Sequence, residues 1–197
     1  MDEKIINYNF FHWGPFLYKT KINKNELNKI KKICSKKSEN CRDSLAGLIK
    51  HEHIVDVKKM FPIIFPYLQS YSRAYKDHYN QVIGNKIELV SSWVNYMIKG
   101  ECNPLHSHEK DLSFIIYTHV PKELEKEIKD SIGKTDPGVI NFIYSLNKDK
   151  HTINTHRFLP EIGDFFIFPS SLHHYVNPFT CKGERISISG NIKIIND

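Results

Sequence analysis

Two histidines separated by one residue carry the clearest chemical signal in the sequence. His106 and His108 lie in residues 103–108, between two segments that we expect to be strands. On an extended backbone, side chains at positions i and i+2 point to the same side, so both imidazoles can bind one metal ion while Ser107 points away. Surface histidines in a turn can have the same spacing, so the pair alone does not establish a metal site.

Two adjacent histidines give the metal interpretation further support. His173 and His174 follow a predicted strand and turn in residues 163–172. Because neighbouring residues on a strand face opposite sides, these two side chains are not expected to reach the same metal ion.

The last predicted strand, residues 185–195, has a polar face and an apolar face. The polar face carries Arg185, Ser187, Ser189 and Asn191, and the other face carries Ile186, Ile188 and Ile192. An arginine in a ligand cavity can hold a carboxylate through two parallel hydrogen bonds, and a hydroxyl two residues on can add another. A solvent-facing polar edge explains the serines and the asparagine equally well.

Two amphipathic helices are predicted ahead of these segments. Residues 25–34 place apolar side chains at helical spacing, with Asn23 or Asn25 available as the N-cap. Residues 57–82 carry a longer stripe of Met60, Phe61, Ile64, Leu68, Tyr71, Tyr75 and Tyr79. Such a stripe is typical of a helix that faces a core, and Pro62 and Pro66 predict kinked or separate first turns.

The C-terminal half is predicted to be all β. Short β-branched or aromatic runs cover residues 87–98, 112–120, 139–146, 164–168 and 185–195. This order indicates a closed or sandwiched antiparallel sheet flanked by helices. The charged residues 122–134 predict a surface helix or an excursion between strands. We expect one domain, with a mainly helical support region at residues 1–84 and a β core at residues 85–197.

Composition limits the classes of protein that remain. The formal net charge of +6 permits attraction to phosphate, but lysines crowd residues 19–37 on a predicted helix surface, so nucleic-acid binding is only weakly supported. No apolar run reaches the roughly 18 residues of a membrane span, and the N-terminus lacks the order of a secretory signal. The four cysteines form no CxxC pair and are expected to be reduced. We therefore expect a cytoplasmic protein.

Five short motifs follow one another in an order that carries a family resemblance. They are Trp93-Val94-Asn95, Pro104-Leu105-His106-Ser107-His108, Leu112-Ser113, Phe168-Pro169-Ser170-Ser171-Leu172-His173-His174 and Glu184-Arg185-Ile186-Ser187. In this order they resemble the 2-oxoglutarate- and Fe(II)-dependent oxygenases, in particular a group of small phage and marine-bacterial oxygenases. The resemblance implies that the cytoplasm is that of a bacterial cell or a phage-infected host. The resemblance covers residues 87–193, and the eleven-residue step from His174 to Arg185 is its most specific part.

The resemblance implies a fold, a reaction and a set of site residues. It implies a double-stranded β-helix, or jelly roll, that uses Fe(II), O2 and the co-substrate 2-oxoglutarate to hydroxylate a substrate, with release of succinate and CO2. His106 and His174 become metal ligands, Arg185 and Ser187 become binders of the far carboxylate of 2-oxoglutarate, and His173 is left outside the ligand set. Candidates for lining the cavity on the predicted strands are Trp93, Asn95, Tyr117 and Tyr144, and of these Asn95 and Tyr117 are candidates for binding the co-substrate. Core packing explains the aromatic residues equally well.

Position 108 departs from the usual pattern of the superfamily. A facial triad has two histidines and one carboxylate, yet the place of the carboxylate holds a histidine. His108 is the favoured third ligand because it shares parity with His106, whereas Glu109 and Asp111 have the opposite parity on a regular strand. The alternatives are that one of these carboxylates swings in, or that chloride or water completes a site with two protein ligands.

Two other functions remain open at this point. A cupin-type metalloenzyme with three histidines could act without 2-oxoglutarate, and a jelly-roll binding protein could have lost catalysis. His51 and His53 form a second pair at the same spacing, which we hold as a reserve metal site and expect at the surface of the helical region. The substrate is left open among protein side chains, free amino acids, nucleic acids and small metabolites.

Overall fold

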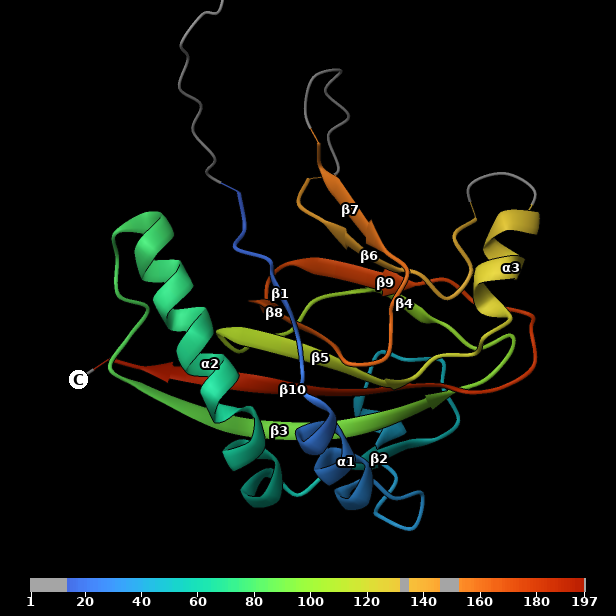
Figure 1. Cartoon of the computed structure of the whole chain (residues 1–197), viewed down its shortest axis with the longest axis horizontal. Helices are drawn as coiled ribbons and strands as arrows, with labels where there is room; N and C mark the ends of the chain where they lie inside the picture. The colour runs from blue at the N-terminus through green and yellow to red at the C-terminus, as the bar shows by residue number, and fades with distance from the viewer. Residues whose placement is uncertain (1–13, 132–134, 146–152, 197) are drawn as a thin grey trace, which may run out of the picture.

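The computed structural model describes residues 14–131, 135–145 and 153–196 of the chain. Its elements in chain order are β1 (Tyr18–Lys21), α1 (Lys24–Ile33), the 3-10 helix η1 (Arg42–Ser44), β2 (Glu52–Ile54), α2 (Val57–Tyr79), β3 (Lys86–Met97), β4 (Asn103–His106), β5 (Leu112–His119), α3 (Leu124–Asp130), β6 (Ile140–Ile143), β7 (Thr155–Phe158), β8 (Asp164–Pro169), β9 (His173–Val176) and β10 (Arg185–Ile195). The long strands β3, β5 and β10 run through the middle of the molecule (Figure 1).

The strands form two antiparallel sheets that make a jelly roll. The large sheet has the order β1-β8-β5-β10-β3-β2, and the small sheet has the order β4-β9-β6-β7. In Figure 1 the small sheet lies above the large one, with α1 and α2 outside the large sheet. The mainly β fold predicted from the sequence, a double-stranded β-helix with N-terminal helices, is confirmed.

Alternation along the strands separates the apolar residues into two cores. On β5, Phe114 and Ile116 join the core that contains α1 and α2, whereas Ile115 and Tyr117 join the core shared with the small sheet. Successive side chains on a strand point to opposite faces, so one strand can serve both layers. The central strands of the large sheet are therefore buried on both sides, and the side that faces the small sheet carries the site.

The two predicted helices are present with slightly shifted ends. Asn23 is the N-cap of α1, and its side-chain oxygen accepts a hydrogen bond of 2.9 Å from the backbone N–H of Glu26. Helix α2 is continuous through Pro62 and Pro66 and ends at Asn80, which adopts the left-handed conformation. Its predicted apolar stripe is buried at Met60, Ile64, Leu68 and Tyr71.

Several short strands lie outside the predicted segments. β1 pairs with β8 and β2 pairs with β3, so the region expected to be mainly helical also supplies both edge strands of the large sheet. Strands of three or four residues are too short to show a period of two, which explains why the pattern missed them. The excursion predicted for residues 122–134 contains α3, although residues 132–134 lie outside the described residues.

All four cysteines lie among the described residues, and each is a free thiol. Within the part of the chain that the structure describes, no helix combines the length and the apolar character that crossing a bilayer requires.

Candidate metal centre and ligand cavity

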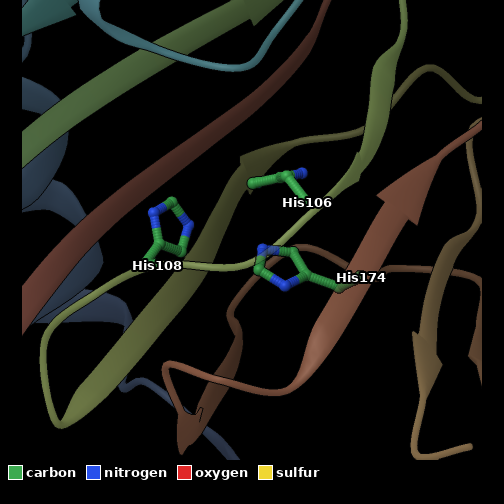
Figure 2. Close-up of side chains that lie close together, drawn as sticks. All are labelled: His106, His108 and His174. Carbon is green, nitrogen blue, oxygen red and sulfur yellow. The ribbon is translucent and has the colours of Figure 1, made fainter.

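Three histidines converge between the two sheets. His106 ends β4 and faces His174 directly across the β4–β9 pair, while His108 follows β4 by two residues (Figure 2). The ring centroids of His106 and His174 are 4.2 Å apart, and the ring of His108 lies 5.0 Å from His106 and 5.4 Å from His174. One ring nitrogen from each histidine lies within 4.8 Å of the other two. The sequence-predicted trio is therefore brought together in space.

Backbone contacts fix how these rings are presented. Nδ1 of His106 lies 2.7 Å from the carbonyl oxygen of Pro104, and Nδ1 of His174 lies 2.9 Å from that of Leu172. A carbonyl oxygen can only accept, so Nδ1 carries the proton in both rings and Nε2 keeps its lone pair for a metal. The backbone N–H of His108 donates to the carbonyl of Ser170 at 2.8 Å, which holds the segment beyond β4 against the loop before β9.

Burial keeps the three imidazoles neutral. It lowers the pKa of His174 to about 3 and that of His108 to about 4, with a smaller lowering of each from the nearby ring of His106. Burial also lowers the pKa of His106, although its hydrogen bond with Pro104 opposes that effect. Neutral imidazole is the form that binds metals, so the three nitrogens suit a divalent transition-metal ion without first losing protons.

The alternative ligands near position 108 point elsewhere. Glu109 is exposed, and a side-chain oxygen of Asp111 accepts a hydrogen bond of 2.7 Å from the backbone N–H of Ile194. Neither carboxylate belongs to the three-histidine group found among the described residues. His173 is exposed, on the opposite side of β9 from the buried His174. The geometry favours His108 as the third ligand, a role that stays a prediction.

An arginine is buried in the same cavity, and no ion pair involves it among the described residues. Arg185 is 3% exposed, and its Nη2 donates to the hydroxyl of Tyr117 at 2.8 Å while its guanidinium carbon lies 4.7 Å from the centre of that ring. Its Nη1 lies 3.8 Å from the sulfur of Met97, and its Nε has no partner in the described residues. A buried charge without a counter-charge is costly, which makes Arg185 a strong candidate for holding an anion.

Four strands of the large sheet contribute one transverse row of polar side chains. Glu52 of β2 pairs with Asn95 of β3, Asn95 pairs with Ser187 of β10, and Ser187 pairs with Tyr117 of β5. Side chains in register point to the same face, and all four line the cavity that also contains the histidines and Arg185. The amide nitrogen of Asn95 is 3.4 Å from the hydroxyls of both Ser187 and Ser189.

Two earlier expectations about aromatic and histidine residues are corrected by the structure. Trp93 lines the cavity, but Tyr144 lies just beyond β6 and is 55% exposed, outside the cavity lining. His53 belongs to strand β2 and is 5% exposed, so it is not a surface residue of a helical region. His51 and His53 stack with centroids 5.9 Å apart, and no third metal ligand joins them among the described residues.

Sequence reasoning did not single out Glu52. Its strand has three residues, and its neighbours are the two histidines that drew attention instead. The signal appears only through the strand register, which brings Glu52 beside Asn95.

Solved structures support the same fold. A prolyl-4-hydroxylase from Pseudomonas putida superposes with a TM-score of 0.58 at 13% identity, covering 91% of this chain and 92% of that one. The viral collagen prolyl hydroxylase of Paramecium bursaria Chlorella virus 1, in complex with 2-oxoglutarate, gives 0.55 at 14% identity, over 91% and 96%. HygX from Streptomyces hygroscopicus, with nickel and 2-oxoglutarate bound, gives 0.52 at 10% identity, over 90% and 81%.

Sequence comparison identifies the family. No curated protein matches the chain at a significant level. The family model described as "Putative 2OG-Fe(II) oxygenase" matches residues 91–191, about half of the chain, and this span contains the three histidines, Arg185 and Ser187. The chain therefore belongs to the 2-oxoglutarate- and Fe(II)-dependent oxygenase family.

Proposed function

We propose that this protein is a 2-oxoglutarate-dependent hydroxylase whose Fe(II) is held by His106, His108 and His174. The observation that carries the proposal is the pairing, in one cavity, of three converging neutral imidazoles with the buried guanidinium of Arg185. A metal and an anion are thereby offered sites on opposite walls of the same space. A diacid that chelates the metal at one end and meets a cation at the other fits that arrangement.

The donor set fits the metal that the family implies. Two of the three rings are locked as Nδ1–H tautomers by backbone carbonyls, so Nε2 can bind without rearrangement. When bound, Fe(II) supplies the activation of O2 that is coupled to the conversion of 2-oxoglutarate to succinate and CO2 and to hydroxylation of the substrate. Three neutral imidazoles leave more positive charge at the metal than a facial triad does, and anionic 2-oxoglutarate compensates for it.

The large sheet would orient the co-substrate. The guanidinium of Arg185 can offer two parallel N–H donors to the far carboxylate, and Ser187 can add its hydroxyl from the same face of β10. The hydrogen bond from Arg185 to Tyr117 fixes the direction of the fork before the ligand arrives. Asn95 holds the Ser187 hydroxyl from the neighbouring strand. Because Arg185, Ser187 and Asn95 are buried, this part of the cavity would keep water away from the bound co-substrate.

The all-histidine set also supports a second candidate. A cupin-type enzyme that uses the same three ligands without 2-oxoglutarate would have a different use for Arg185, such as binding its substrate directly. We favour the oxygenase because the family match spans Arg185 as well as the histidines. We place its action in the cytoplasm, where free thiols such as the four cysteines stay reduced.

One experiment tests the proposal directly. Protein purified without oxygen is loaded with Mn(II), titrated with 2-oxoglutarate by calorimetry, then reloaded with Fe(II) and assayed in air for succinate and CO2. We expect binding that requires the metal, and slow succinate formation even without a substrate. Metal binding without any affinity for 2-oxoglutarate would instead support the cupin-type alternative.

A further inference from the structure

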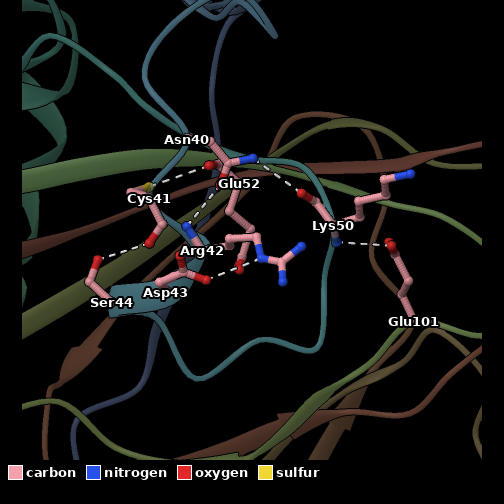
Figure 3. Close-up of polar contacts among 8 residues, drawn as sticks. All are labelled: Asn40, Cys41, Arg42, Asp43, Ser44, Lys50, Glu52 and Glu101. Atoms are coloured by element: carbon pink, nitrogen blue, oxygen red, sulfur yellow. Dashed lines mark hydrogen bonds and ion pairs between the residues drawn. The ribbon is translucent and has the colours of Figure 1, made fainter.

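Glu52 is a buried carboxyl group that the proposed oxygenase chemistry does not use. Its residue is 1% exposed, its side chain lines the cavity, and Oε2 has no hydrogen-bond partner among the described residues. Its hydrogen bonds to the neighbouring loop run through its backbone carbonyl oxygen, which accepts from the N–H of Cys41 at 2.8 Å and from the thiol of Cys41 at 3.5 Å (Figure 3). The side chain is therefore placed by its strand and left open on the cavity side.

The two charged groups whose electrostatic effect reaches Glu52, Glu101 and Arg42, are hydrogen-bonded to other residues. One carboxylate oxygen of Glu101 accepts from the backbone N–H of Lys50 and the other from that of Ile98, both at 2.9 Å. Nε of Arg42 donates to Asp43 at 3.2 Å (Figure 3). Burial raises the pKa of Glu52 to about 7, and the charge of Glu101 raises it further while that of Arg42 lowers it. The protein thus keeps a carboxyl that its own fold does not stabilise in the charged form.

The strand register places Glu52 beyond the reach of the co-substrate. Glu52 and Tyr117 occupy the two ends of the transverse row, three interstrand steps or about 14 Å apart. A five-carbon chain with bonds of about 1.5 Å is at most about 6 Å long, so 2-oxoglutarate held near Arg185 and Tyr117 leaves the Glu52 end free. The ionised carboxyl of Glu52 would also repel the carboxylates of 2-oxoglutarate. That end is available to the primary substrate.

A glycine keeps the space beside the carboxyl open. A Cβ added to Gly47 would lie 2.7 Å from Oε1 of Glu52 and 3.1 Å from Oδ1 of Asn103. Gly47 is not among the described residues with a positive φ, so its backbone does not require glycine. The loop that contains Gly47 lines the cavity, and the missing side chain leaves an approach to two oxygen acceptors.

We infer that Glu52 binds the primary substrate, and that this substrate presents a protonated nitrogen, an ammonium or guanidinium group, to the Glu52 end of the cavity. The inference rests on the proposed function and adds a substrate class to it. The acceptors that gather there are Glu52 Oε2, Oδ1 of Asn95, which also lacks a partner in the described chain, and Oδ1 of Asn103. A cation with several N–H donors satisfies such a set and provides the missing counter-charge.

The test uses matched probes that differ only in charge. Protein loaded with Mn(II) and 2-oxoglutarate is titrated with n-butylguanidine and its neutral isostere n-butylurea, and with n-butylamine and its neutral counterpart n-butanol, so that the neutral probes carry no protonated nitrogen. The paramagnetic broadening of probe protons near Mn(II) reports binding in this cavity. We expect at least one cationic probe to bind at least tenfold more tightly than its neutral partner. Equal binding within both pairs, or no binding of either cation, would overturn the inference.

Three variants assign the effect to the carboxyl. Glu52→Gln keeps the shape of the side chain and should lose at least tenfold in affinity for the cationic probe. Gly47→Ala should weaken the same binding by filling the approach. Glu88→Gln makes the same chemical change at an exposed position of β3 and should behave as the unaltered protein. Unchanged probe binding in Glu52→Gln would also overturn the inference.

Binding of 2-oxoglutarate separates the two hypotheses. Glu52→Gln should bind Mn(II) and 2-oxoglutarate as tightly as the unaltered protein, since Glu52 does not belong to the three-histidine group and stands three interstrand steps from Tyr117. If 2-oxoglutarate binds and the cationic probes do not, only the assignment of Glu52 fails. If 2-oxoglutarate itself does not bind to the metal-loaded protein, the proposed function fails.

Discussion

The two walls of the cavity are built in different ways. On the small-sheet wall, two of the three histidines have their second ring nitrogen paired with a carbonyl two residues earlier, so the chain itself prepares the metal site. On the large-sheet wall, each of three cavity-lining side chains keeps a buried polar atom without a partner in the described residues. These atoms are Oε2 of Glu52, Oδ1 of Asn95 and Nε of Arg185.

The two walls are therefore prepared for different ligands, one for a metal ion and the other for an organic molecule. A metal ion is held by a few short bonds, so its ligands must be oriented in advance by neighbours that remain in place. An organic ligand brings its own donors and acceptors, so the wall that binds it keeps atoms whose desolvation is compensated only on binding. Variants of the small-sheet wall should therefore affect metal binding, and variants of the large-sheet wall should affect organic ligands and stability.

The largest effect is expected from removing two metal ligands together. His106→Ala combined with His174→Ala should abolish binding of Fe(II), Mn(II), Co(II) or Ni(II), because one remaining imidazole cannot hold the ion. Metal content after anaerobic loading and desalting measures this. His173→Ala is the matched control, since that side chain points away from the site, and it should keep full metal content. Full occupancy in the double variant would refute the site.

Loss of His108 should weaken the site without abolishing it. His108→Ala should raise the Kd for the metal by about a hundredfold, because two ligands from β4 and β9 remain, whereas His108→Asp should rebuild a facial triad and keep iron binding. A metal-bound structure measures the same point directly. A nitrogen of His108 should lie about 2.0–2.2 Å from the ion. If the refined structure places both ring nitrogens of His108 more than about 3 Å from the ion, His108 is not a ligand and another group holds the third position.

Removing the guanidinium of Arg185 should weaken the binding of 2-oxoglutarate and leave the binding of the metal unchanged. Arg185→Ala should raise the Kd for 2-oxoglutarate by more than tenfold, since truncating one partner of a buried charge pair costs about 2–5 kcal/mol. Arg185→Lys should restore part of the affinity because lysine offers a point charge instead of a fork. Calorimetry on Mn(II)-loaded protein gives both constants. Unaltered 2-oxoglutarate affinity in Arg185→Ala would favour the cupin-type alternative.

The sequence predicted the Arg185 end of the cavity far better than the Glu52 end. Strand β10 has eleven residues, so its alternation is long enough to place Arg185 and Ser187 on one face. The family resemblance then supplied their order relative to His174. Strand β2 has three residues and gave no such pattern, and Glu52 reaches the cavity only because β2 pairs with β3. Pairing between distant segments is not encoded in local periodicity.

Position 108 shows a similar limit. The spacing predicted convergence with His106 on a regular strand, but β4 ends at His106. The approach of His108 depends on its backbone hydrogen bond to Ser170, which lies more than sixty residues further along the chain. His108 therefore lies close to His106, as its i+2 spacing predicted. The position of His108 comes from its tertiary contact with Ser170, which no local sequence pattern contains.

The last expected effect is on the stability of the apoprotein, and it tests the claim that the large-sheet wall keeps polar atoms without partners until its ligand binds. The folded pKa of Glu52, about 7, lies above the usual value of 4.5, because burial disfavours the charged form. Below about pH 4.5 the carboxyl of Glu52 is protonated in both the folded and the unfolded state, so its ionisation does not change the free energy of unfolding. As pH rises from 4.5 to 7, only the unfolded chain ionises, and stability is lost.

Glu52→Gln removes this loss. The variant should match the unaltered apoprotein in free energy of unfolding near pH 4.5 and exceed it by about 3 to 3.5 kcal/mol at pH 8, following roughly 1.4 kcal/mol per unit of pKa shift. Urea denaturation at both pH values measures the difference, with Glu88→Gln as the control at an exposed site. Equal stability at pH 8 would mean that Glu52 is satisfied within the fold. The large-sheet wall would then be no less complete at this end than the metal-binding wall.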